Sequence, residues 1–335
     1  MSARRILITG ATGGLGFALV REALARGHSV LATGRSAEAG AKLTALGAEF
    51  IALDLADPRT DLRRLVLGCD SVIHAAALSA SWGPREAFEK TNVAMTRRLL
   101  QAATGEGVSR LVFVSSPSIF ASFADRLGIG EDEAPTSPLN HYAATKLAAE
   151  KIVLAPRSGG PACCVIRPRA LVGPGDRVIL PKLAAMARRN RMPLPGGGKA
   201  LIELTDLRDA ARAICEAEER LPDNSGKAIN ISGGNPVTVR EVAERLAASL
   251  GENPRLVSLP LVVARPLASL VETYARLRGA QEEPVLTRYT LATLGWSQTF
   301  DQEPARRLLD YHPRHDALAT MLDEARKLAA KEMQQ

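Results

Sequence analysis

Tyr142 and Lys146 are the two residues whose types and spacing best suit proton transfer in this 335-residue sequence. A spacing of four places both side chains on one face of the helix that we predict for residues 140–154. A free phenol has a pKa near ~10 and is a poor acid–base group at neutral pH. A nearby ammonium group stabilises the phenolate and lowers that pKa, so this pair suits general acid–base chemistry.

Two serines at the end of a strand-like run, residues 110–115, are candidates to act with this pair. A hydroxyl at this point is expected near Tyr142, where it can bind the oxygen of a reacting group. Ser116 is the favoured residue and Ser115 is the alternative. Serines at strand ends are also common turn residues, so the surrounding elements must decide.

A glycine-rich segment near the N-terminus, Thr9 to Gly16 (TGATGGLG), supplies that context. It follows an apolar run at 6–8 and leads into a helix-like run at 17–26. Such a loop turns sharply, approaches a pyrophosphate closely and presents helix amides to the anion. Strand before and helix after are what a dinucleotide-binding loop requires. The loop residues assigned to the cofactor are Gly10, Thr12, Gly13, Gly14, Leu15 and Gly16.

The end of the second strand-like run indicates which dinucleotide is bound. NAD-binding folds usually place a carboxylate here for the ribose 2′-hydroxyl, whereas this chain has Gly34, followed by Arg35 and Ser36. Without that carboxylate, a guanidinium can bind a 2′-phosphate in a forked geometry. We therefore predict NADP(H), with NAD(H) as the alternative. A surface arginine with no ligand is the other interpretation of Arg35.

The next two strand ends provide further cofactor candidates. Asp54 can accept from the adenine amino group while Leu55 flanks the ring, although a solvated strand-end Asp is a serious alternative. Small residues at Ala75, Ala76 and Ala77 let the backbone pass beside the ribose and pyrophosphate. His74 precedes the strand end, so we expect it to pack behind the sheet rather than to catalyse.

Strand-like and helix-like runs alternate strictly through the first half of the chain. This pattern predicts a doubly wound parallel sheet of Rossmann type, an α/β fold, with a smaller and mostly helical C-terminal substrate-binding portion. We place the dinucleotide-binding part at 1–170, with 200–235 returning to it, and the substrate-binding part at 171–199 and 236–335. The strands are expected at 5–9, 29–33, 49–53, 71–74, 110–115, 163–167 and 227–231, and the helices at 14–26, 37–46, 61–67, 84–103, 140–154, 237–250 (with Thr238 as N-cap) and 316–332.

Composition narrows the classes of partner and compartment. The net charge is +7, but the basic residues are dispersed among acids and aromatics are only 4%, which argues against nucleic-acid binding. Four cysteines without zinc-ligand spacing fit a reducing, cytoplasmic setting, and no metal site is expected. No stretch is long and apolar enough to span a bilayer. Residues 256–275 are apolar and could lie on a membrane surface, but we favour a cover over a substrate pocket.

Together these segments resemble the extended short-chain dehydrogenases/reductases, within the NAD(P)-dependent epimerase/dehydratase and 3β-hydroxysteroid dehydrogenase group. Further matches lie at 91–93 (TNV), 167–176 (RPRALVGPGD) and 205–211 (TDLRDAA). The resemblance implies that Tyr142 exchanges the proton, Lys146 binds the nicotinamide ribose, and Ser116 steadies the reacting oxygen. It also implies that Pro168 borders the nicotinamide and that the chain forms a homodimer through the helices at 84–103 and 140–154.

Residues 77–84 (ALSASWGP), 287–290 and 297–301 are similar to 3β-hydroxysteroid dehydrogenase-like bacterial reductases, including 2-alkyl-3-oxoalkanoate reductases. This similarity implies a small hydrophobic carbonyl or hydroxyl substrate. Ser79 and Trp82 are then expected beside the substrate, and Arg169 or Arg177 could hold a carboxylate, although both could be surface or structural arginines. Sugar-nucleotide members commonly show Tyr-Gly where this chain has Phe120-Ala121.

Three functions remain open at this point. The leading one is an NADP-dependent oxidoreductase acting on a ketone or secondary alcohol of a hydrophobic substrate, either a 3-oxo acid or a sterol-like molecule. The second is a sugar-nucleotide epimerase or dehydratase with tightly held NAD. The third is a dinucleotide-sensing protein without catalysis, which usually loses the tyrosine or the lysine, whereas both are present here.

Overall fold

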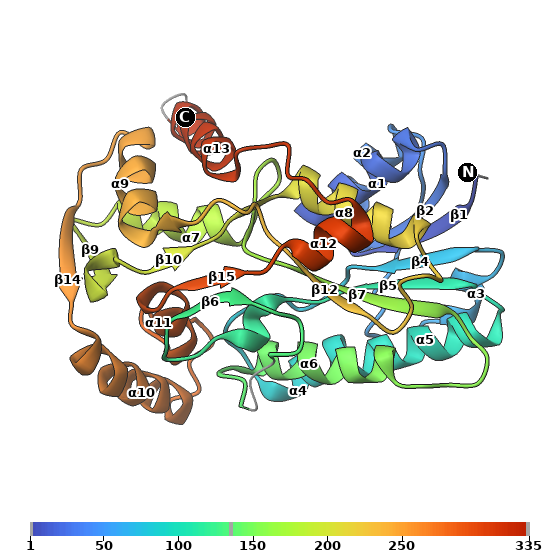
Figure 1. The fold of residues 1–335 in the computed structure, drawn as a ribbon, viewed down its shortest axis with the longest axis horizontal. Helices are drawn as coiled ribbons and strands as arrows, with labels where there is room; N and C mark the ends of the chain where they lie inside the picture. The colour runs from blue at the N-terminus through green and yellow to red at the C-terminus, as the bar shows by residue number, and fades with distance from the viewer. Residues whose placement is uncertain (1–2, 134–136, 333–335) are drawn as a thin grey trace.

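A seven-stranded sheet forms the centre of the computed structural model, which describes residues 3–133 and 137–332. Its strands are β1 (Arg5–Thr9), β2 (Ser29–Gly34), β3 (Glu49–Ala52), β4 (Ser71–His74), β5 (Arg110–Val114), β7 (Ala162–Pro168) and β12 (Ala228–Ile231). They lie in the order β12-β7-β5-β4-β1-β2-β3, and every neighbouring pair is parallel. The predicted doubly wound Rossmann-type fold is confirmed (Figure 1).

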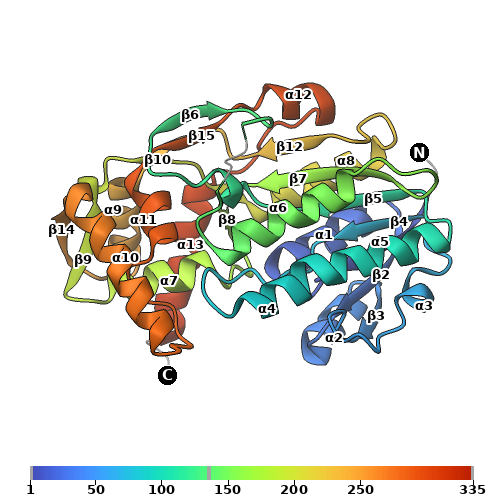
Figure 2. The same cartoon turned by 90° about the horizontal axis from the view of Figure 1, so that it is seen from below.

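Both faces of the sheet are buried, because alternate residues of each strand point to opposite sides. Ile6 and Ile8 of β1 enter one core and Leu7 enters the other. Helices α4, α5 and α6 lie together along one face in Figure 2. The first core contains residues of α1 (Gly14–Ala25), α2 (Ala37–Thr44), α8 (Leu207–Glu219) and α12 (Glu303–Leu309); the second contains residues of α3 (Leu62–Val66), α5 (Met95–Gly105) and α6 (His141–Leu154).

A later segment of the chain, which includes α8 and β12, also belongs to the central sheet portion. Helix α8 packs against α1, and β12 pairs with β7 in the register Ile229↔Ile166. Both elements come from the segment 200–235. The boundaries that we assign to the two portions of the chain remain a prediction.

The helix predicted as one piece over 84–103 is interrupted. It consists of α4 (Arg85–Phe88), a π-helical turn at Glu89–Ala94 and then α5. Single π-helical turns inside α-helices often occur at functional positions. Here the turn carries Asn92, whose buried side chain accepts a hydrogen bond from the amide of Leu78, outside the helix. A π-helical turn of this kind leaves the buried face of the helix unchanged. The spacing of apolar residues in the sequence therefore does not reveal it.

The C-terminal portion has its own core and lies at the opposite end of the molecule from α3 and α5 in Figure 1. Thr238 caps α9 as predicted, since its Oγ1 accepts from the amide of Glu241 at 3.1 Å. The helices of this portion are α7 (Ile179–Ala187), α9 (Val239–Ser249), α10 (Leu261–Leu277), α11 (Arg288–Gly295) and α13 (Ala317–Glu332).

Four short strand pairs connect distant parts of the chain, and the sequence patterns did not predict them. They are β9 (Arg191–Pro195) with β14 (Arg255–Leu259), β6 (Arg126–Ile129) with β15 (Gln298–Phe300), β8 (Leu171–Val172) with β11 (Thr205–Asp206), and β10 (Leu201–Ile202) with β13 (Val237–Thr238). Segments of two to five residues carry too little periodicity to be recognised, and only their partners fix them.

Helix α10 contains most of the apolar stretch 256–275. Its inner side packs Ala264 and Ala268 against Leu291 of α11. Its outer side leaves large apolar residues exposed, namely Val262, Val263, Leu267, Leu270, Tyr274 and Leu277. Within 3–133 and 137–332, no helix is both long and apolar enough to cross a membrane.

Candidate active site

Helix α6 presents Tyr142 and Lys146 at the carboxyl end of the sheet. Asn140 caps the helix, its Oδ1 accepting from the amide of Ala143 at 2.8 Å. Lys146 is only 2% exposed and its Nζ donates to the carbonyl of Val114, the last residue of β5, at 2.6 Å. The same Nζ lies 4.1 Å from the centroid of the Phe113 ring. The lysine is therefore fixed against the strand rather than free in solvent.

Burial acts on the ionisation of both residues. It lowers the pKa of Lys146 to about 7, an effect that the carboxylate of Glu150 opposes. It raises the pKa of Tyr142 to about 12, and a hydrogen bond with the Ser116 side chain opposes that shift. The lowering of the phenol pKa that is expected from the lysine together with an oxidised nicotinamide stays a prediction for the cofactor-bound protein, since without the cofactor the pKa of Tyr142 is raised. The reason is that desolvation outweighs every favourable contact, while the Lys146 ammonium is directed at Val114.

The two serines behave differently. Ser116 begins the 3₁₀ turn Pro117–Phe120, its Oγ accepting from the amide of Ser118 at 3.2 Å, and it is the hydrogen-bond partner that holds down the Tyr142 pKa. Ser115 is buried and its hydroxyl donates to the Glu150 carboxylate. Ser116 therefore faces the phenol, whereas the side chain of Ser115 faces away from it.

A buried ion pair between Arg167 and Glu150 joins α6 to β7. Sequence reasoning did not predict this pair. The guanidinium of Arg167 donates to Glu150, with Nη2 and Oε2 2.7 Å apart, and both side chains are buried. Glu150 lies one helical turn after Lys146, a spacing visible in the sequence, but nothing there connects it to Arg167. The pair fixes α6 to β7 beside the strand end that carries Pro168.

The glycine loop fits a dinucleotide. Gly13 begins α1 without any side-chain cap, and the first turn has no acidic residue, so its amides are open to an anion. A Cβ at Gly16 would lie 2.1 Å from the carbonyl of Gly10, and one at Gly14 would lie 2.6 Å from that of Gly175. Gly10 has φ +69° and its Cβ would meet the backbone of Ala76 at 2.8 Å. These glycines let strand, helix and the Ala75–Ala77 loop approach closely.

The end of β2 has no room for the carboxylate typical of NAD sites. A Cβ at Gly34 would lie 2.5 Å from Oγ1 of Thr12, so any side chain there requires Thr12 to move. Arg35 is exposed beside it. Ser36 caps α2, since its Oγ accepts from the amide of Ala39 at 3.2 Å.

The adenine candidates lie at the end of β3. Asp54 is exposed and its Oδ1 accepts from the amide of Ala56 at 2.9 Å. Leu55 next to it is buried. One oxygen of Asp54 is thus used in the local turn, and the other is available to a ligand.

His74 is part of a closed hydrogen-bond chain. Thr96 donates to the carbonyl of Asn92 at 2.7 Å, so its oxygen accepts from His74 Nε2, which is 3.0 Å away. Thr9 accepts from the amide of Ala76 and donates to His74 Nδ1 at 2.8 Å. Burial lowers the pKa of His74 to about 3, so the ring stays neutral. The prediction that it packs behind the sheet is confirmed.

Asn92 fixes the loop after β4 to α6. Its Oδ1 accepts from the amide of Leu78 at 2.8 Å, and its Nδ2 donates to the carbonyl of Leu78 and to Thr145 Oγ1, both within 3.2 Å. The sequence analysis included Asn92 only as part of the TNV segment. Its role depends on the π-helical turn that carries it.

The predicted substrate residues separate into two groups. Ser79 and Arg177 are exposed, whereas Arg169 is buried. Trp82 donates to the carbonyl of Ala280 at 2.9 Å, which attaches the loop after β4 to the C-terminal portion. Tyr289 of α11 contributes to the raised pKa of Tyr142, and sequence reasoning did not assign it to the site.

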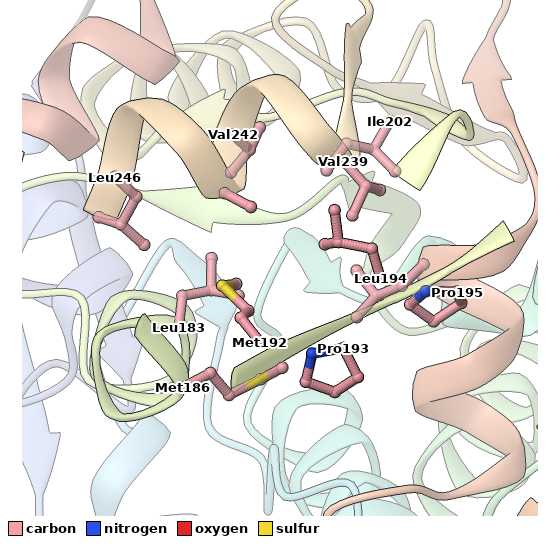
Figure 3. A pocket seen from close by; sticks show the side chains of 12 residues that line it. Leu183, Met186, Met192, Pro193, Leu194, Pro195, Ile202, Val239, Val242 and Leu246 are labelled. Atoms are coloured by element: carbon pink, nitrogen blue, oxygen red, sulfur yellow. The ribbon is translucent and has the colours of Figure 1, made fainter. Parts of the chain in front are cut away.

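A small cavity lies elsewhere in the C-terminal portion. Its volume is about 30 Å³, which leaves room for little more than a water molecule. Figure 3 shows apolar side chains of α7, β9 and α9 converging on it, among them Leu183, Met192 and Leu246. None of its lining residues is a candidate for catalysis or cofactor binding, so it is not the substrate site. Among the residues that the structure describes, no group of His, Cys, Asp and Glu could hold a metal ion.

Comparison with known proteins agrees with this geometry. Residues 6–232 match the NAD dependent epimerase/dehydratase family. The chain is 36% identical to a 2-alkyl-3-oxoalkanoate reductase of Stenotrophomonas maltophilia, over 92% of this chain and 95% of that protein. It is 33% identical to a 4-hydroxy-2-methyl-3-oxo-4-farnesyl-3,4-dihydroquinoline-1-oxide ketoreductase of Stigmatella aurantiaca, over 92% of each. A solved structure, MoeE5 in complex with UDP-glucose and NAD, superimposes with a TM-score of 0.74 at 27% identity, covering 97% of this chain and 99% of that one.

Proposed function

Because the chain belongs to the NAD dependent epimerase/dehydratase family of NAD(P)-dependent oxidoreductases, we propose that it is an NADP(H)-dependent reductase of a ketone on a hydrophobic substrate. The observation that carries this proposal is the Tyr142 phenol near Ser116, whose side chain opposes the rise of the Tyr142 pKa, one helical turn from the buried Lys146. The substrates named for the two relatives, a 2-alkyl-3-oxoalkanoate and a prenylated quinoline ketone, support an oily carbonyl compound.

The residues divide the reaction between them. The bound nicotinamide supplies the hydride to the carbonyl carbon. Tyr142 gives its proton to the developing alkoxide, while the Ser116 hydroxyl donates a hydrogen bond to the same oxygen. In the chain alone the phenol is a weak acid, since burial raises the pKa of Tyr142 to about 12. Lys146 is buried one helical turn away, where its Nζ donates to the carbonyl of Val114, and the family resemblance assigns it to the nicotinamide ribose.

The preference for NADP(H) is supported by the end of β2. Position 34 has no carboxylate, Thr12 packs where a side chain there would begin, and the exposed Arg35 guanidinium can receive a 2′-phosphate. With NAD(H) that guanidinium has no phosphate to bind.

The test is oxidation of NADPH, followed at the nicotinamide absorbance, with a 2-alkyl-3-oxo acid, a 3-ketosteroid and simple aldehydes, and NADH in parallel. We expect turnover with NADPH on one oily ketone. No oxidation across the panel, with NAD found bound to the purified protein, would overturn the proposal.

That second outcome would favour the other candidate, a sugar-nucleotide epimerase or dehydratase. The observation in its favour is the overall similarity to MoeE5, which binds UDP-glucose and NAD. Gly34 and Arg35 argue against it, and so does Phe120, which is fully buried against Phe300 instead of facing a sugar. A sensing protein without catalysis has no observation in its favour, since the full Tyr142, Lys146 and Ser116 set is in place.

Three further features stay proposals. The outer side of α10 combines exposed apolar residues with the cations Arg265, Arg276 and Arg278, which supports contact with an anionic membrane surface. The family resemblance supports a homodimer through α5 and α6. Four buried, unpaired cysteines support a reducing, cytoplasmic setting.

A further inference from the structure

Arg169 is a buried cation without a partner. The residue is 7% exposed, and its Nε has no hydrogen-bond partner. Within the described residues its guanidinium forms neither an ion pair nor a hydrogen bond. Removing a charge from water without compensation is strongly unfavourable, so such groups are normally paired. An arginine kept in this state points to a partner that arrives from outside the chain.

The nearest protein carboxyl group is already engaged. Glu203 is close enough to act on the Arg169 pKa, yet no ion pair joins them. Its Oε2 accepts from the amide of Phe300 at 3.2 Å, and the Ser232 side chain is a second partner. Glu203 therefore compensates the charge only at a distance.

Backbone hydrogen bonds hold Arg169 in place, and the next residue adopts an unfavourable backbone conformation. Its amide donates to Ile231 at 2.9 Å, its carbonyl accepts from the Thr205 hydroxyl, and the Thr205 amide donates to Ala170 at 3.0 Å. Ala170 has φ +38°, a left-handed conformation that is unfavourable for a residue with a side chain. Strain of this kind is kept where the surrounding structure imposes it, and it gathers at functional sites.

Arg169 lies in the neighbourhood of the reacting groups. It follows β7 directly, next to the β5 end that carries Ser116. The Tyr289 phenol contributes to the raised pKa of Tyr142, and the Arg169 charge opposes the burial that raises the pKa of Tyr289. The ring of Phe300 covers the guanidinium, with its centroid 5.8 Å from Cζ. The buried charge thus borders the space above the catalytic tyrosine.

We propose that Arg169 binds a carboxylate of the substrate and thereby selects, among oily ketones, those that carry the carboxylate one carbon from the reacting carbonyl. The inference rests on the proposed reductase function. A planar guanidinium matches a carboxylate with two parallel hydrogen bonds. In a 3-oxo acid a single carbon separates the two groups, so a cation beside Tyr142 is where the geometry requires one. Pairing with the Arg169 guanidinium stabilises the ionised form of the substrate carboxylate while the neighbouring carbonyl is reduced.

The experiment compares a 2-alkyl-3-oxo acid with its neutral methyl ester, using NADPH and the full-length chain. For the wild type we expect the KM of the acid to be about 100-fold below that of the ester, since loss of a buried charge pair is costly. Arg169→Met should raise the KM of the acid to that of the ester and leave the ester unchanged. The matched control is Arg126→Met, which also removes an arginine that covers a phenylalanine ring but is paired with Glu133.

Each outcome is decisive. Preference for the acid that persists in Arg169→Met, or equal KM values in the wild type, overturns the inference while the reductase function stands. No reduction of either compound overturns the reductase function itself. If thermal melting shows that Arg169→Met does not fold, competitive inhibition of wild-type ester reduction replaces it. A saturated 2-alkyl carboxylic acid should then inhibit about 100-fold more tightly than its amide, and equal inhibition overturns the inference.

Discussion

Burial moves the pKa values of Tyr142 and Lys146 in opposite directions, each against the charged form. Without a ligand, the phenol therefore stays protonated at neutral pH and the lysine is only partly charged. This differs from the phenolate–ammonium pair that the four-residue spacing suggests. Spacing reports which side chains share a helix face, but not how much water reaches them.

Tyr142→Phe should lower kcat at least about 100-fold while NADPH binding is unchanged, because only the proton donor is lost. Turnover is measured by NADPH absorbance and binding by nucleotide fluorescence. The control is Tyr274→Phe, which removes the hydroxyl of an exposed tyrosine on α10. Wild-type turnover in Tyr142→Phe would contradict the assignment.

Lys146 should make the nucleotide-free protein less stable at low pH than a Lys146→Met variant. The folded-state pKa, about 7, lies below the ordinary value of 10.5, so the unfolded chain binds more protons between these values. The penalty is full below pH 7 and fades as the pH rises toward 10.5. In urea unfolding we expect the free energy of unfolding to favour the variant by about 3 kcal/mol more at pH 6 than at pH 9. A constant difference across this range would show that charge burial is not the cause.

At the same scale, sequence predicts some site residues and not others. The glycine loop and the Tyr142 and Lys146 pair carry local patterns that physical reasoning can interpret. Arg167 and Tyr289 carry none, because their roles come from contacts with residues far away in the chain. Arg169 and Arg177 look equivalent in sequence, and only the fold makes one buried and leaves the other exposed.

At the scale of elements, the π-helical turn joins the loop after β4 to α6 through one side chain. Asn92→Ala should lower the free energy of unfolding by about 2 kcal/mol, because the amide and carbonyl of Leu78 lose their buried partner. It should also lower kcat, since the turn aligns α6. Urea unfolding of Asn190→Ala, an exposed asparagine, is the control and should stay within about 0.5 kcal/mol of the wild type.

Helix α10 should bind lipid through its outer side. We expect the protein to co-sediment with vesicles containing anionic phospholipid and not with neutral ones, because the exposed apolar residues are flanked by arginines. Leu267→Ser with Leu270→Ser should abolish this binding, whereas Leu127→Ser, an exposed leucine on β6, should not. Equal sedimentation of the double variant would exclude α10 as the contact.

The long elements were predictable and the short ones were not. Each strand of the central sheet has an apolar run of its own, α1 follows the glycine loop directly, and α6 begins at the capping residue Asn140. The two-residue strands β8 and β11 have neither, and they exist because the fold brings Leu171 beside Thr205. The π-helical turn was missed because apolar periodicity does not distinguish it from a turn of α-helix.

At the scale of the molecule, the last part of the chain completes both portions. β15 pairs with β6, the Gln298 side chain donates to the carbonyl of Phe120 at 3.1 Å, and Tyr311 is buried in the core of the sheet. A chain ending at residue 296 should therefore lose cooperative unfolding, as followed by circular dichroism. Tyr311→Phe, which loses only the hydrogen bond to Ser232, should keep it. A cooperative transition in the shortened chain would show that the sheet portion is independent.

The late position of these pieces matters during synthesis. Strand β12 and Tyr311 leave the ribosome well after β1 to β7, so the first half of the nascent chain emerges with one edge of its sheet unpaired and one core uncovered. Open strand edges and exposed apolar surface make such intermediates prone to aggregation. The central sheet and its core are thus completed only after β12 and Tyr311 have been synthesised.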